Sequence, residues 1–288
     1  MKLTPGPHVA RILIAVGIAT IGAGNSPADD SGHTTEVVLT SDVVWQPLNP
    51  ARGDKAPKAG TLWGDQTKDG ASGFLVKFVD GFSSPPHIHN ITYRGVVIAG
   101  ALHNDDPDAA PMWMPAGSYW MQPAGEVHIT AARGASVAFL EIQSGPYLVK
   151  PPKESFDNGQ RPLNLDATNR VWLDATASDW IDHSDETKKP GDGPELSLLW
   201  GDTTEGNVNA SLLKLPAGFR GRLSDDSTFR AVVIQGDLTL SLSDQRGDQA
   251  LTPGSYFGSQ EKASHRVHTD DGCLIYVRNE GGFDVSSR

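Results

Sequence analysis

The strongest constraint on the fold is that the chain repeats itself. The segment "TLWGDQTKDGASGFLVKFVDGF" (61–82) is echoed by "LLWGDTTEGNVNASLLKLPAGF" (198–219), so that the two LWGD tetrapeptides begin 137 residues apart, at Leu62 and Leu199. Three more pairs follow in the same order: 94–100 with 230–236, 115–122 with 252–259, and 136–145 with 273–282. A period held this closely over four matches predicts a duplicated structural unit.

Each copy has the pattern of β structure. Its apolar segments are short, rich in β-branched and aromatic residues, and bounded by Gly, Pro or Asp, as in "GFLVKFV" (73–79) and "RGVVIAGAL" (94–102). Gly 31 and Pro 20 in 288 residues also favour many turns. Short strands at this spacing are typical of a sandwich or barrel and argue against alternating β–α units.

The repeat divides the chain into two expected domains, 35–149 and 170–288, joined by a polar, Pro-bearing linker. Before them, Lys2 and Arg11 precede an apolar run at 12–23 and small residues, which is the order of a signal peptide. We expect residues 1–28 to be that signal, with an uncleaved anchor and a core helix as the alternatives. The mature protein is then exported, periplasmic or extracellular, with no membrane segment.

Composition excludes one class of partner and one kind of site. The formal net charge is −11 and no basic patch is visible, so we expect no binding to nucleic acid. The single cysteine, Cys273, rules out an intrachain disulfide and any CxxC metal site. It lies in the apolar segment "GCLIYVRN" and is expected to be a buried thiol.

Two histidines, His87 and His89, stand one residue apart in "GFSSPPHIHNITYRG" (81–95). Residues i and i+2 of a strand share a face, so the two imidazoles can bind one metal ion. His128, in "PAGEVHITA", follows a turn signal and begins another apolar segment, which makes it the third candidate ligand.

The pattern around these histidines resembles the two motifs of the cupin superfamily. Gly81, His87, His89 and Gly100 match the first motif, and Gly117, Pro123, Gly125 and His128 match the second. Tyr93 stands where the family has a ligand Glu, and Ala132 replaces an Asn. Because the resemblance extends over both copies, it implies two tandem cupin jelly-roll β-barrels, an all-β bicupin similar to an uncharacterised exported group.

The resemblance also implies what the site holds. Without the ligand Glu, three neutral histidines remain, as in the three-histidine cupins, and they imply one divalent metal ion, Fe, Zn, Ni or Mn. Tyr93 and Glu126 are the candidate catalytic residues. Tyr93 either donates a hydrogen bond to a metal-bound group or only packs, and Glu126 either faces the site or is a solvated carboxylate in a turn. Glu141 either accepts a hydrogen bond from a ligand imidazole or faces solvent. Strand exchange is common among cupins, so the resemblance allows a homodimer.

The second copy lacks this constellation. Aligned on shared glycines, His87, His89 and Tyr93 become Leu223, Asp225 and Phe229, and only His265 matches His128. We therefore expect a degenerate second site, with His265 and His268 as surface or pocket residues.

Two functions of different classes remain. The first is a metal-dependent oxygenase, or an enzyme that cleaves C–C bonds, acting on a small carbonyl compound; a Lewis-acid isomerase or hydrolase is a variant of it. The second is a non-catalytic module that binds or senses a metal or small ligand and resembles the cupin domains of zinc-binding anti-sigma factors. A fold alone cannot choose between them, and whether the chain is an enzyme at all stays open at this point.

Overall fold

The computed structural model describes residues 35–182, 191–243 and 246–287. The expected signal peptide, residues 1–28, lies outside them. Every ladder between named strands is antiparallel, which confirms the predicted all-β class and the jelly-roll arrangement. No helix in the described ranges is both long and apolar enough to cross a membrane. The helices are three short 3₁₀ segments: η1 (Thr40–Asp42), η2 (Pro50–Lys55) and η3 (Pro152–Glu154).

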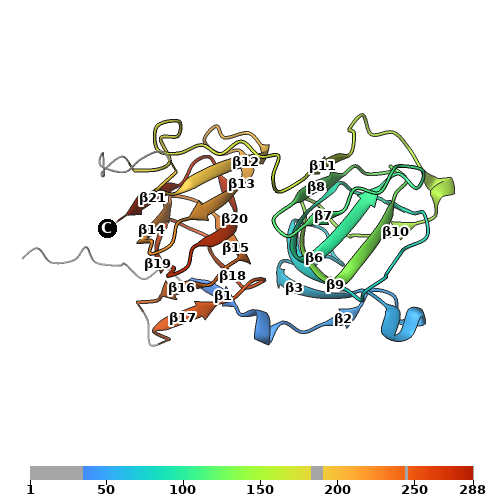
Figure 1. Ribbon diagram of the computed structural model, residues 1–288. Helices are drawn as coiled ribbons and strands as arrows, with labels where there is room; N and C mark the ends of the chain where they lie inside the picture. The colour runs from blue at the N-terminus through green and yellow to red at the C-terminus, as the bar shows by residue number, and fades with distance from the viewer. Residues whose placement is uncertain (1–34, 183–190, 244–245, 288) are drawn as a thin grey trace, which may run out of the picture. The chain divides into compact units, whose positions relative to one another are not determined.

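The first half is built on one large sheet and one small one (Figure 1). The large sheet contains β2 (Gln46–Pro47), β3 (Lys58–Trp63), β4 (Ser72–Phe78), β9 (Ile129–Ile142), β6 (Tyr93–Asp105), β8 (Tyr119–Gln122) and β11 (Leu163–Leu165), with β7 (Met114–Pro115) paired to β6. The small sheet contains β5 (Ile88–His89) and β10 (Val149–Lys150).

The second half is built on two sheets. The first contains β1 (Glu36–Val38), β18 (Tyr256–Ser259), β15 (Phe229–Gln235), β20 (Cys273–Glu280), β13 (Val208–Leu215) and β12 (Glu195–Gly201). The second contains β17 (Asp248–Leu251), β16 (Leu238–Ser241), β19 (Ala263–His268), β14 (Arg220–Asp225) and β21 (Asp284–Ser287).

The two longest strands of the first half, β6 and β9, bend as they pair. Their register shifts between Val97 and Ala101, and Gly100 at the bend has φ +71°, a conformation that glycine adopts without strain. A Cβ there would lie 2.2 Å from the Ser136 hydroxyl, so no other residue fits. Because of this bend, β6 and β9 run through the body of the sheet and also reach the end that carries the histidines.

The two halves exchange their first strands. β1 precedes the first copy of the repeat but pairs with β18 of the second half, Val37 opposite Phe257. β11 precedes the second copy but pairs with β8 of the first half, Asn164 opposite Trp120. Figure 1 shows β1, in blue, beside the orange β18, and the yellow-green β11 beside β8.

The halves also share a hydrophobic core. One cluster of buried residues draws on both, including Phe139 of β9 and Tyr276 of β20, whose rings lie 4.9 Å apart. The contacts repeat reciprocally: Arg94 lies over the Trp200 ring at 4.1 Å, and the equivalent Arg230 lies over the Trp63 ring at 5.7 Å. Such mutual contacts between equivalent residues are the mark of a two-fold interface, here formed within one chain.

Glu141 lies in this interface, 1% exposed, which corrects both sequence interpretations of it. Its Oε1 accepts from Arg278 Nε at 3.1 Å and its Oε2 from the Tyr276 hydroxyl at 2.6 Å. Burial raises the pKa of the Glu141 carboxyl, and the Arg278 guanidinium opposes that rise. Glu141 and Arg278 occupy equivalent positions of the repeat, so the ion pair joins corresponding positions of the two halves across the interface.

Replacing one partner of this pair should destabilise the protein strongly. Glu141→Leu leaves a buried guanidinium uncompensated and should lower the free energy of unfolding by about 3–5 kcal/mol, while Glu141→Leu/Arg278→Met should recover most of that loss. Urea unfolding of the single and double variants measures both values. Asp157→Asn, in the exposed Asp157–Arg161 pair, is the control and should change little. Additive losses in the double variant would show that the pair is not coupled.

Cys273 should be unreactive in the folded protein. It is 5% exposed, and burial, followed by the charge of Asp237, raises the pKa of its thiol to about 12, so almost no thiolate forms at pH 8. A thiol-specific colorimetric reagent should label none of it in buffer and all of it in concentrated urea. Rapid labelling in buffer would mean that β20 opens readily.

Candidate metal centre

The candidate site begins with a backbone pairing between His87 and His128. The His87 N–H donates to the His128 carbonyl at 3.0 Å, and the His128 N–H donates back at the same distance. Residues paired in this way lie directly opposite each other on neighbouring strands. Two residues 41 positions apart are thereby held with their side chains on one face.

His89 is fixed by two further contacts. It pairs with Val149 in the β5–β10 ladder, and its carbonyl accepts from the Gly125 N–H at 2.8 Å. Gly125 has φ +79°, and a Cβ there would lie 2.3 Å from the Phe156 carbonyl oxygen. The glycine of the second motif therefore lets the backbone at Phe156 lie directly against the turn before His128.

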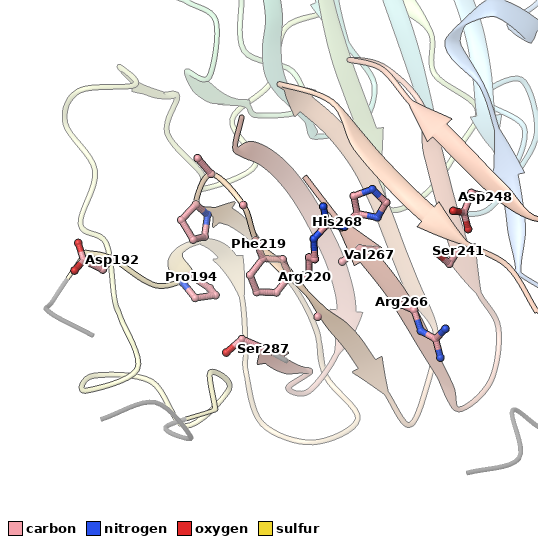
Figure 2. Close-up of a pocket in the computed structure, with 14 residues that line it drawn as sticks. Asp192, Pro194, Phe219, Arg220, Ser241, Asp248, Arg266, Val267, His268 and Ser287 are labelled. Carbon is pink, nitrogen blue, oxygen red and sulfur yellow. The ribbon is translucent and has the colours of Figure 1, made fainter. Parts of the chain in front are cut away.

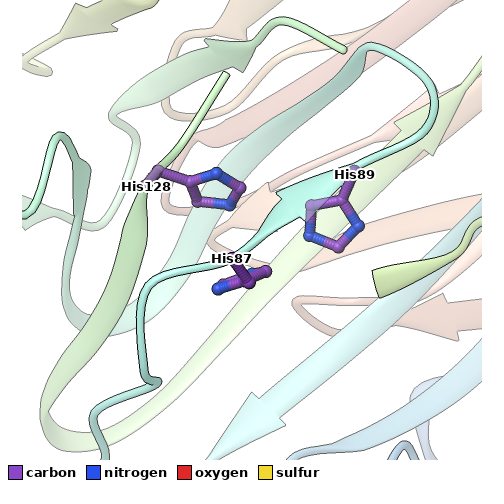
Figure 3. Close-up of side chains that lie close together, drawn as sticks. All are labelled: His87, His89 and His128. Carbon is purple, nitrogen blue, oxygen red and sulfur yellow. The ribbon is translucent and has the colours of Figure 1, made fainter. Parts of the chain in front are cut away.

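These pairings bring the three histidines together. The ring centroids lie 5.0 Å apart for His87 and His89, 4.3 Å for His87 and His128, and 5.3 Å for His89 and His128. One nitrogen from each ring lies within 4.8 Å of the other two, and Figure 3 shows the rings turned toward a common space. No other group of three His, Cys, Asp or Glu side chains in the described ranges meets in this way.

Hydrogen bonds orient two of the rings. His87 Nδ1 lies 3.0 Å from the Pro85 carbonyl oxygen, and His128 Nδ1 lies 3.1 Å from the Glu126 carbonyl oxygen. A carbonyl only accepts, so each Nδ1 carries the proton and each Nε2 keeps its lone pair. Histidines that bind metal ions in proteins commonly donate their other ring N–H to a carbonyl oxygen in this way.

All three imidazoles are neutral at pH 7. Burial lowers the pKa of His87, lowers that of His128 to about 3, and lowers that of His89 well below its usual value. Positive charge on neighbouring histidines lowers the pKa of His89 and His128 further. Three converging neutral imidazoles repel no cation and suit Zn, Fe, Cu or Ni, so the donor set fits a metal ion.

Tyr93 faces the histidines and belongs to a buried polar network. Its hydroxyl lies 2.9 Å from Asn104 Oδ1 and 3.2 Å from His128 Nε2. Thr130 donates to the same Asn104 oxygen at 2.8 Å, and Asn104 Nδ2 donates to Gln122 at 2.9 Å. Asn104 Oδ1 thus accepts from both the Tyr93 and the Thr130 hydroxyls, and this network holds the Tyr93 hydroxyl beside His128.

A second tyrosine, Tyr147, was not found by sequence reasoning. Its ring stacks on His89 with centroids 4.2 Å apart, and its hydroxyl lies 3.1 Å from His89 Nε2. It comes from the segment between β9 and β10, outside both motifs. No sequence motif marks Tyr147. The pairing of Val149 with His89 brings it to the site, and the sequence does not reveal that pairing.

Glu126 contributes differently from the expectation of a catalytic carboxylate. Its carbonyl orients His128, and the residue does not line the cavity beside the histidines. The catalytic role of Glu126 stays a prediction that the geometry does not strengthen.

A cavity of about 290 Å³ opens beside the cluster. His87, His89 and Tyr93 lie in its wall, together with Trp120 and Tyr147. The remaining lining is mostly apolar and includes Val76, Phe78, Phe82, Leu140 and Val149. A small, mainly apolar cavity with a few converging polar groups is the usual form of a small-molecule site.

The second half keeps the backbone of the site and fills its interior. Leu223 pairs with His265 where His87 pairs with His128. Phe229, at the position of Tyr93, lies 5.2 Å from the His265 ring, and Leu223 and Phe229 are fully buried in the core of this half. Asp225, the counterpart of His89, accepts from the Ser227 hydroxyl at 2.7 Å in a local turn.

The large cavity of the second half, about 550 Å³, lies elsewhere. Figure 2 shows its labelled side chains, among them Arg220, Arg266 and His268. Neither Leu223 nor His265 lines it. The cavity therefore does not correspond to the histidine site of the first half.

Comparison with solved structures identifies the fold. A protein of Nostoc punctiforme PCC 73102, described as a candidate dioxygenase, is 19% identical with a TM-score of 0.64, covering 87% of this chain and 84% of that chain. Oxalate decarboxylase of Lactobacillus farciminis, in its formate complex, is 12% identical with a TM-score of 0.53, covering 89% of each chain. At these identities the likeness shows the fold alone, which is that of the cupins.

Comparison with sequences gives a family and no activity. No curated protein matches the chain. A family model matches residues 36–286, nearly all of the described chain, and the chain therefore belongs to the family described as "Domain of unknown function (DUF4437)".

Proposed function

We propose that this protein is a metal-dependent bicupin enzyme whose first half binds one divalent metal ion through His87, His89 and His128. The reaction proposed is oxygenation or C–C bond cleavage of a small carbonyl compound. The observation that carries the proposal is the convergence of three neutral imidazoles, two of which, those of His87 and His89, lie in the wall of a cavity. The candidate dioxygenase from Nostoc punctiforme shares the fold and is consistent with this class of chemistry.

A metal ion bound at such a site supplies Lewis acidity and, if it is iron, a redox couple. The chain's own residues supply the rest. Tyr93 and Tyr147 present hydroxyl protons beside His128 and His89, where they can hydrogen-bond to an oxygen atom of a bound compound. Burial raises the pKa of both phenols, so both stay protonated and act as donors. Trp120 and Phe82 line the cavity and give it apolar surface.

The cavity favours an enzyme over a non-catalytic zinc module. A structural zinc site is closed by four protein ligands, whereas a catalytic site keeps a position open. No fourth His, Cys, Asp or Glu joins the cluster in the part of the chain that the structure describes. The space beside the three rings is instead open to the cavity. A module that only holds a structural zinc ion would not need this space.

Export and assembly are further parts of the proposal. The order of charged, apolar and small residues at 1–28 supports a signal peptide and an exported, periplasmic or extracellular protein. A homodimer stays a prediction from the resemblance to cupins.

Metal content is the first test. Untagged protein should carry about one metal ion per chain, as a single three-histidine site requires. His87→Ala/His89→Ala should carry none. His87→Leu is a sharper variant, because Leu223 fills the equivalent position in the second half and shows that the fold accepts it. His268→Gln, outside the cluster, should keep the metal. Elemental analysis after purification and after incubation with Fe, Zn, Ni or Mn measures the content; an empty wild-type protein would refute the proposal.

Tyr93→Phe separates catalysis from metal binding. The second half has Phe229 at this position, fully buried, so the variant should fold. Because Tyr93 is proposed as a hydrogen-bond donor and not as a ligand, metal content should be unchanged while turnover falls by about 10–100-fold. Oxygen uptake with small diketones and metal analysis are measured on the same preparation. Loss of the metal in Tyr93→Phe would make Tyr93 a ligand and contradict this role.

A further inference from the structure

The charge distribution around the cavity is unlike that of the rest of the chain. The protein has 35 Asp and Glu residues against 24 Lys and Arg residues, yet no Asp or Glu lines the cavity beside the histidines. One cationic side chain does line it, that of Arg52. The cavity is therefore the one place near the cluster where an anion meets attraction without a nearby lining carboxylate to oppose it.

Arg52 is held at the cavity by a constrained segment. Asn49 Oδ1 accepts from the Ala51 N–H at 3.1 Å and caps η2, and the Leu48 N–H donates to the Pro57 carbonyl at 2.8 Å. The guanidinium lies over the Phe82 ring, with Cζ 5.3 Å from the centroid. A stacked guanidinium is partly preorganised, so less freedom is lost when it binds a ligand.

The donors of Arg52 remain available. Arg52 forms no ion pair within the described ranges, although it is half-buried. Arg52 and His87 line the same cavity, so the guanidinium and the histidine cluster face one bound molecule. A planar guanidinium with free N–H groups matches a carboxylate through two parallel hydrogen bonds.

The remaining lining residues indicate what the part of the ligand away from Arg52 should be. Phe78 and Phe82 lie 5.2 Å apart next to Arg52, and Trp120 and Leu140 continue the apolar wall toward Tyr93. A volume of about 290 Å³ is at the low end of ligand cavities, so one small molecule fills it. The lining combines one cation, an apolar wall and the histidine cluster.

We propose that the cavity takes a small organic acid with an apolar body, and that Arg52 binds its carboxylate. This names the substrate class of the proposed metal site and rests on that proposed function: the carboxylate lies at Arg52, the apolar body lies against Phe78 and Phe82, and the reacting carbon lies toward the histidines.

The test uses phenylacetate, its neutral counterpart phenylacetamide, and the full mature chain after treatment with a chelator. Isothermal titration should show that phenylacetate binds about 10-fold or more tightly than the amide, as expected for a charge-assisted pair. Arg52→Gln should remove that preference, and Arg52→Lys should restore part of it. Lys55→Gln, in the same 3₁₀ segment but outside the lining, should behave as wild type.

Two results would overturn the proposal. Equal binding of acid and amide, or no binding of either, would show that the cavity does not select a carboxylate. Binding of phenylacetate only to metal-loaded protein, with Arg52→Gln unaffected, would show that the metal holds the carboxylate. Metal content measured on every variant keeps this outcome separate from failure of the metal site, and thermal unfolding confirms that Arg52→Gln is folded.

Discussion

The buried Glu141 carboxyl group depends on Arg278 and Tyr276 of the other half of the chain, which donate to its two oxygen atoms, with Gln143 of its own half as a further donor. Taking a carboxylate out of water costs several kcal/mol, and only well-placed partners offset that cost. Arg278 and Tyr276 are not available within the half that carries Glu141. The interface is therefore part of the folded core of each half. The described residues of both halves accordingly form a single compact unit even though the sequence repeats within it.

This dependence reaches the candidate metal centre through β9. The strand begins at Ile129, one residue after His128, and ends beside Glu141 in the interface. Over its length it pairs with β4 and β6, which provide Val76 and Tyr93 to the cavity wall. The pairing of halves thus anchors one end of the strand, and the histidines are held at the other.

Much of the fold was predictable because the same pattern of apolar segments and turns occurs in both copies of the repeat. The β segments at 73–79 and 94–102 correspond to β4 and β6, and strand alternation placed His87 and His89 on one face. Arg52, Asn104 and Tyr147 were missed, since each comes to the site from a segment outside the motifs. Their positions depend on the strand register and on where loops close. Glu141 was misplaced for the same reason: nothing in "SVAFLEI" reveals a partner 137 residues away.

The comparison of the two halves distinguishes residues that maintain the fold from residues that form the candidate metal site. Gly100 and Gly236 keep the left-handed conformation in both copies, and the LWGD tryptophans, Trp63 and Trp200, each lie under an arginine from the opposite half. These features persist where the histidines do not, so they serve folding. Where the first half has His87 and Tyr93, the second half has Leu223 and Phe229, and both of these side chains are packed into its hydrophobic core.

The exchange of β1 and β11 gives the chain a topology that cannot be divided at the linker. A cut between 151 and 162 would put β11 on a different fragment from β8 and β1 on a different fragment from β18. Each fragment would then expose a row of unpaired backbone N–H and C=O groups, the kind of edge that promotes aggregation. Two polypeptides that traded these strands would form a mutually locked dimer. A single chain achieves the same lock with its own two halves, at a local concentration that no dilution can lower.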